Sequence, residues 1–77
     1  EAFSAVAMAA QDDFKIPMDK INIFGGSVAM GHPIGASGAR ILATLLNGMK
    51  NKKAKYGLAT LCIGGGEACA MIVKNYD

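Results

Sequence analysis

The sequence has few of the residues that hold most small domains together. Its 77 residues include two cysteines, one histidine, two prolines and no tryptophan. Domains of this size bury a small share of their surface, so those that fold alone usually rely on disulfides, a metal or oligomerisation. Two cysteines and one histidine are too few for a disulfide scaffold or a four-ligand zinc site. The chain is therefore either an idealised small domain or part of a larger chain.

Charged residues and long apolar runs are also scarce. Only 18% of the residues are charged, with a net charge of +2, and 52% are hydrophobic, a balance that excludes a disordered chain. No stretch reaches the roughly 18 apolar residues of a membrane span, so no membrane partner is expected. Lys52, Lys53 and Lys55 lie close together but without interleaved aromatic residues, so no nucleic-acid partner is expected. This run favours a solvated turn, with phosphate contact as the alternative.

The beginning of the chain has helical spacing. Apolar residues from Ala2 to Ala10 recur on one face and predict a helix from the first residue to about Ala10 or Phe14, closed by Pro17. No Ser, Thr, Asp or Asn precedes this helix to cap it, and no initiating Met, signal peptide or transit peptide is present. We therefore expect the first residue to be a cut end within a longer chain.

The remaining pattern predicts an α/β fold in the order helix–strand–helix–strand–strand. A strand is expected at residues 21–24, a helix from about Ala36, and strands at residues 56–63 and 68–73. The glycines between the last two strands supply the positive φ angles of a tight turn. Both final strands are apolar enough to be buried on both faces in a mixed sheet, under cover from other parts of the protein. The expected apolar face of the second helix consists of Ile41, Leu42, Leu45, Leu46 and Met49.

Two segments contain candidates for chemistry. Residues 31–38 are rich in glycine and open a helix, a context that suits anion binding, with close backbone packing as the alternative. His32 lies in a rigid turn before Pro33, where an imidazole with a pKa near 6.5 can act as a base or a donor. A purely structural histidine is the alternative.

Cys62 is the second candidate, because it lies at a strand end just before three glycines. A thiol in that position can act as a nucleophile or as an acid and base if its pKa falls from about 8.5. Cys69 is expected to be an ordinary buried hydrophobic residue. The six residues between the two cysteines match no common metal or redox spacing, so no metal site is predicted.

Together these segments resemble signatures of the thiolase family. The segment from Gly25 to Arg40, with its Gly-His-Pro core, is similar to one of them. Cys62-Ile63-Gly64-Gly65-Gly66 is similar to the C-terminal Cys-x-Gly-Gly-Gly signature. Glu1-Ala2-Phe3 resembles the end of an Asn-Glu-Ala-Phe motif. The three blocks stand in the family's order and the resemblance covers essentially the whole chain.

The resemblance implies a position within a larger fold. Thiolases consist of two similar βαβαβαββ domains whose mixed sheets are covered by helices. Residues 1–77 would be the last helix–strand–helix–strand–strand of the C-terminal domain, in a two-domain chain of roughly 400 residues.

The resemblance also implies an activity and assigns roles. The family transfers acyl groups between coenzyme A thioesters through an acyl-cysteine, whose cysteine lies in the N-terminal half. His32 would activate that thiol, and Cys62 would move the α-proton of the acetyl thioester. The backbone N–H of Gly64 would serve the oxyanion hole. The pocket for the substrate and coenzyme A would include Ala2, Phe3 and Ile63.

The segment from Ile34 to Ser37 is closer to thiolases that transfer acetyl groups, which condense two acetyl-CoA reversibly to acetoacetyl-CoA. A 3-ketoacyl-CoA thiolase of fatty-acid β-oxidation is the alternative. A non-catalytic relative that binds acyl-CoA or lipid is a third interpretation, although such a protein need not keep both His32 and Cys62. No cofactor or metal is expected, because the coenzyme A thioesters are substrates.

The implied partners are the missing N-terminal part of the chain and further copies of it, in a homodimer or a homotetramer. The implied compartment is the cytoplasm or the mitochondrion. The last three residues, Asn75 to Asp77, contain no peroxisomal signal.

Overall fold

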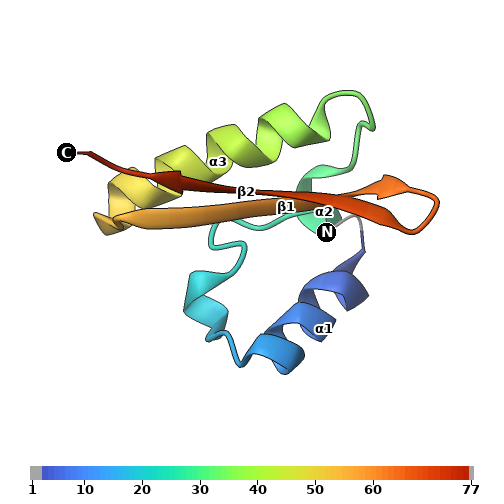
Figure 1. Ribbon diagram of the computed structural model, residues 1–77, viewed down its shortest axis with the longest axis horizontal. Helices are drawn as coiled ribbons and strands as arrows, with labels where there is room; N and C mark the ends of the chain where they lie inside the picture. Colours follow the sequence, from blue (N-terminus) through green and yellow to red (C-terminus); the bar gives the residue numbers. More distant parts are fainter. Residues whose placement is uncertain (1–2, 77) are drawn as a thin grey trace. The chain divides into compact units, whose positions relative to one another are not determined.

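The computed structural model describes residues 3–76, and the chain divides into two compact units, residues 1–32 and 33–77. The first unit contains helix α1 (Ser4–Phe14), a short 3-10 helix η1 (Met18–Lys20) and helix α2 (Ser27–Met30). The second contains helix α3 (Ser37–Lys52) and strands β1 (Tyr56–Gly64) and β2 (Glu67–Lys74), as Figure 1 shows. The helices and the two-stranded sheet confirm the α/β class. Within residues 3–76, no helix combines the length and apolar character needed to cross a membrane.

Helix α1 confirms the helix expected at the beginning of the chain. It follows Phe3, whose backbone is extended and whose side chain provides no capping hydrogen bond. It ends at Phe14; the next residue, Lys15, is in the left-handed region with φ of 56°, and Pro17 follows shortly after. The amide of Ile16 donates to the carbonyl of Gln11 at 3.1 Å and so satisfies one carbonyl of the last turn. The expected first two helical residues, Glu1 and Ala2, lie outside the described part of the chain.

The prediction of a strand at residues 21–24 is wrong. Asn22 has a φ of 48°, and the amide of Gly25 donates to its carbonyl at 2.8 Å, so the segment forms a turn. A strand is stable only where a neighbouring strand pairs with its backbone groups, and here the turn satisfies one such pair locally. The described sheet therefore consists of two antiparallel strands and is not the mixed sheet that was expected.

Helix α3 is confirmed, and part of its predicted apolar face contacts β1. Met49 is 5% exposed, and the neighbouring Gly48 is also buried. Leu46 is 50% exposed, so the predicted apolar face is wider than the face that is buried. In Figure 1, α3 runs along the hairpin of β1 and β2.

The hairpin of β1 and β2 is confirmed together with its tight turn. Gly64 pairs with Glu67, so Gly65 and Gly66 form a two-residue connection with φ angles of 60° and 79°. Positive φ at both positions is the type I′ geometry, which matches the right-handed twist of the strands and strongly favours glycine. The turn residues therefore set the pairing of Gly64 with Glu67, and the register shifts by one residue before the next pair, Cys62 with Ala68.

Burial on both faces of the hairpin, which the apolar sequence predicted, is not found within the described residues. Along β1, the half-buried residues Gly57, Ala59 and Leu61 alternate with exposed ones. Leu58 and Ile72 are register partners on the other face and are 57% and 72% exposed. The apolar side chains of both faces are present, but α3 is a single helix and packs on one face only.

Gly57 permits the close approach of α3 to β1. A Cβ atom added at this position would lie 2.5 Å from Sδ of Met49 and 2.9 Å from Cδ1 of Leu45. Contacts this short do not occur in folded proteins, so any larger residue would push the helix side chains away. A side chain at position 57 would therefore require the side chains of Met49 and Leu45 to shift.

Replacing Gly57 with Ala should destabilise the full-length protein by about 1–3 kcal/mol, because the added methyl group overpacks the contact with Met49 and Leu45. Gly38→Ala is the matched control, since a Cβ at that helical position meets nothing within 4 Å. The control substitution should leave the free energy of unfolding unchanged or raise it by up to about 1 kcal/mol. Urea denaturation measures both, and equal stability of the two variants would contradict the proposed close packing.

Candidate functional site

Cys62, Ile63 and Gly64 form the end of β1, next to the glycine turn. Cys62 pairs with Ala68 and the next pair is Gly64 with Glu67, so the register shifts between them and Ile63 has no partner of its own. Gly64 has a φ of 129°, which residues with a side chain rarely adopt. Such irregularities commonly re-aim a side chain at the end of a strand. The three predicted site residues of this segment are therefore consecutive and held in an irregular, glycine-dependent backbone.

The two cysteines lie on opposite faces of the hairpin. Cys62 pairs with Ala68 while Cys69 pairs with Leu61, and successive residues of a strand point to opposite sides. Both thiols are free and exposed, so the expectation that Cys69 is buried is wrong. Cys69 shares its face with Leu61, whereas Cys62 lies on the same face as Leu58. The hairpin therefore presents two thiols in different surroundings.

A hydrogen bond across the hairpin stiffens the strands near Cys62. The hydroxyl of Thr60 donates to the backbone carbonyl of Cys69 at 2.9 Å. Thr60 stands two residues before Cys62 on the same face of β1. The bond adds a side-chain link to the backbone ladder close to the thiol.

His32 is half-buried and is separated from the end of α2 by one residue, Gly31. The preceding residue, Gly31, has φ of 87° and ψ of 172°, a combination that is essentially restricted to glycine. Its amide donates to the carbonyl of Ser27 at 2.6 Å and closes the helix. Gly31 therefore sets the direction in which the chain enters His32. Sequence reasoning identified His32 but missed this role; the signal was a glycine immediately before the His-Pro pair.

The chain after His32 is organised around the carbonyl of Pro33. This oxygen accepts hydrogen bonds from the amides of Ala36 and Ser37, at 2.8 and 2.9 Å, and from the hydroxyl of Ser37 at 3.1 Å. Ser37, the first residue of α3, is fully buried. The amides of Ala36 and Ser37 are thus used within the chain, which favours the backbone-packing interpretation of this segment over anion binding by these two donors.

The residues predicted to line the pocket belong to different parts of the chain. Ile63 is 66% exposed, next to Cys62, while Phe3 is 70% exposed at the beginning of α1. Ala2 lies outside the described residues. Phe3 and His32 belong to the first unit, whereas Cys62, Ile63 and Gly64 belong to the second. Among residues 3–76, no three His, Cys, Asp or Glu side chains are grouped so that they could hold a metal ion.

Comparison with known proteins gives a consistent result. The family described as "Thiolase, C-terminal domain" matches residues 1–75. The acetyl-CoA acetyltransferase of Allochromatium vinosum is 55% identical over 75 residues, which cover 97% of this chain and 19% of that protein. The probable acetyl-CoA acyltransferase of Staphylococcus aureus strain NCTC 8325 is 51% identical, over 99% of this chain and 19% of that protein.

A third relative, the acetyl-CoA acetyltransferase of Thiocystis violacea, is 54% identical over 97% of this chain and 19% of its own length. The chain therefore spans about a fifth of the length of these curated relatives.

Gly31→Ala should destabilise the full-length protein by about 1–3 kcal/mol, because alanine is strained at the backbone angles of Gly31 although the space around it is open. Gly35→Ala is the matched control, since its Cβ also meets nothing and its φ is not in the left-handed region. Thermal melting compares the two variants. An unchanged melting temperature for Gly31→Ala would show that its backbone angles are not needed.

Proposed function

Because this chain belongs to the thiolase C-terminal domain family, we propose that it forms part of an acetyl-CoA acetyltransferase. The proposed reaction is the reversible condensation of two acetyl-CoA to acetoacetyl-CoA and free coenzyme A. The observation that carries the proposal is the exposed Cys62 thiol at the irregular strand end before the glycine turn. The names of the relatives, acetyl-CoA acetyltransferase and acetyl-CoA acyltransferase, support the same chemistry.

In the first half-reaction, His32 acts as a base towards a cysteine thiol outside these 77 residues. The resulting thiolate attacks the carbonyl carbon of acetyl-CoA, the bond from that carbon to the sulfur of coenzyme A breaks, and an acetyl-cysteine remains. The departing thiolate of coenzyme A takes up the proton from the imidazole. A histidine suits this exchange because an imidazole can both take up and release a proton near neutral pH. The backbone of Gly31 supports the role by fixing the entry to His32.

In the second half-reaction, the thiolate of Cys62 removes the α-proton of a second acetyl-CoA. The electron pair forms a bond to the carbonyl carbon of the acetyl-cysteine, the bond from that carbon to the sulfur of the nucleophilic cysteine breaks, and the released thiolate takes up the proton from Cys62. An N–H donor from His32 stabilises the enolate oxygen, and the backbone N–H of Gly64 stabilises the oxyanion on the acyl carbon. Fixed donors of this kind are effective because they need no reorganisation during the reaction. The glycine-dependent backbone around Gly64 supports this assignment.

The pantetheine arm of the substrate would pass apolar side chains. Phe3 and Ile63 are large, apolar and mostly exposed, which suits contact with a flexible thioester arm, and Ala2 is proposed to join them. The proposed reaction uses coenzyme A thioesters as substrates and needs no resident cofactor. Assembly as a homodimer or homotetramer remains a prediction, as does a cytoplasmic or mitochondrial location.

Replacing Cys62 with Ala in the full-length protein should lower the rate of acetyl-CoA condensation by about 10²–10⁴-fold, because the α-proton loses its base. Acetylation of the nucleophilic cysteine should persist, seen as release of one coenzyme A per active site. Cys69→Ala is the matched control on the opposite face of the hairpin and should keep condensation within a few-fold of the parent. Condensation at the parent rate in Cys62→Ala would refute the assignment.

Substrate preference is tested by comparing kcat/KM for the cleavage of acetoacetyl-CoA and of a long-chain 3-ketoacyl-CoA. The resemblance of residues 34–37 to acetyl-transferring thiolases predicts the higher value for acetoacetyl-CoA. A higher value for the long-chain thioester would indicate a β-oxidation thiolase.

A further inference from the structure

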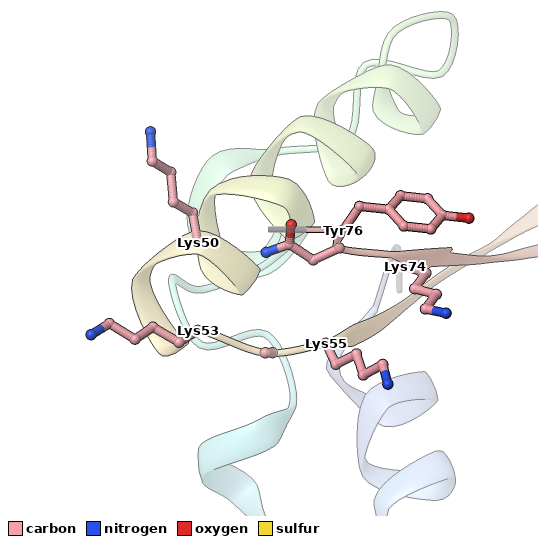
Figure 2. Close-up of a pocket in the computed structure, with 7 residues that line it drawn as sticks. Lys50, Lys53, Lys55, Lys74 and Tyr76 are labelled. Carbon is pink, nitrogen blue, oxygen red and sulfur yellow. The ribbon is translucent and has the colours of Figure 1, made fainter.

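A hollow surrounded by lysines lies at the end of the hairpin opposite the glycine turn. Its volume is about 680 Å³, and Figure 2 shows the side chains around it. Its lining comes from the end of α3, the beginning of β1 and the end of β2: Lys50, Lys53, Ala54, Lys55, Lys74, Asn75 and Tyr76. The hollow is about half open to solvent, so it is a surface depression and not an enclosed cavity.

The backbone around the hollow is fixed by hydrogen bonds between its segments. The amide of Asn75 donates to the carbonyl of Lys55 at 2.7 Å and joins the two strand ends. The amide of Ala54 donates to the carbonyl of Met49 at 2.9 Å and ties the turn after α3 to the helix. Lysines that are far apart in the sequence are thereby placed on one stable framework.

Carboxylates are nearly absent from this unit. Residues 33–77 include two acidic ones: Glu67 pairs with Gly64 at the turn end of the hairpin, and Asp77 lies outside the described residues. The ammonium of Lys55 lies 5.7 Å from the centre of the Tyr56 ring, and that of Lys74 lies 5.9 Å from the same ring. Lys74 also lies 5.3 Å from the ring of Tyr76. Within the described residues, Lys55 and Lys74 therefore interact with aromatic rings.

The four lysines fall into two pairs. Lys50 lies in the last turn of α3 and Lys53 caps it, where positive charge offsets the negative end of the helix dipole. Lys55 and Lys74 lie outside α3 and so do not offset its helix dipole. In Figure 2 they extend to the same side of the hollow, away from Lys50 and Lys53. Two like charges near one tyrosine ring repel each other, and an anion that contacts both would reduce that repulsion. The pair of Lys55 and Lys74 is therefore the centre of the positive surface.

We propose that this hollow binds a small molecule with two or more linked phosphates, held mainly by Lys55 and Lys74. Lysine binds phosphate as a point charge, and several lysines suit a multiply charged group better than a single carboxylate. The strand from Lys55 to Cys62 rises about 3.3 Å per residue, which puts the hollow about 20 Å from the thiol. The proposed site is thus separate from Cys62 and does not depend on the proposed acetyltransferase reaction.

The test is a calorimetric titration of the full-length protein with inorganic pyrophosphate at low and at moderate ionic strength. The parent should bind, with affinity that falls as salt rises. The double variant Lys55→Gln and Lys74→Gln should lose affinity by about tenfold or more, because two charge-assisted contacts are removed. The double variant Lys50→Gln and Lys53→Gln should lose less.

The matched control is Lys15→Gln with Lys20→Gln, which removes the same charge from the other unit and should retain the parent's affinity. The proposal would be overturned if the parent did not bind pyrophosphate, or if the Lys55/Lys74 variant and the control lost affinity equally. If the parent did not bind, the lysines would be either a solvated turn or a docking point for an acidic protein segment. A second titration in the presence of acetyl-CoA identifies the source of the phosphates. Competition means that the phosphates of coenzyme A occupy the hollow, and independence means that a separate ligand does. Neither result requires enzyme turnover, so this test is distinct from that of Cys62.

Discussion

The packing of α3 on β1 at Gly57 is the contact on which the second unit depends. Among the described residues, Met49 is the one large apolar side chain that is buried, and its sulfur occupies the space that a side chain on Gly57 would need. A two-stranded hairpin is marginally stable at best in water unless something packs against it. The contact with α3 therefore stabilises the hairpin, and through it both of its ends.

Those two ends have different chemistry because the residues that form them differ. At the turn, consecutive glycines allow backbone angles that distort the strand next to Cys62 and Gly64. At the other end, the strand termini and the end of α3 collect lysines around a hollow with no carboxylate in its lining. About 20 Å of extended strand separates them. Glycine geometry thus determines one end of the hairpin and charge determines the other.

Local patterns in the sequence predicted the elements that depend on neighbours in sequence. The apolar spacing from Ile41 to Met49 was enough to predict α3, and the three glycines were enough to predict the turn. The strand at residues 21–24 could not be predicted correctly, because strand formation depends on a distant partner and Asn22 forms a turn instead. The exposure of Cys69 was missed for a related reason: small apolar residues do not reveal which faces of a strand are covered.

By itself, the sequence determined the family, the candidates His32, Cys62 and Gly64, and the tight turn, because each depends on residues that are adjacent or nearly adjacent in the chain. Tertiary structure decided what depends on distant residues. It put the two cysteines on opposite faces through the hairpin register, and it brought Lys74 to the hollow that also contains Lys55. Antiparallel pairing does this, since it aligns the last residues of one strand with the first residues of the other, however far apart they are in the sequence.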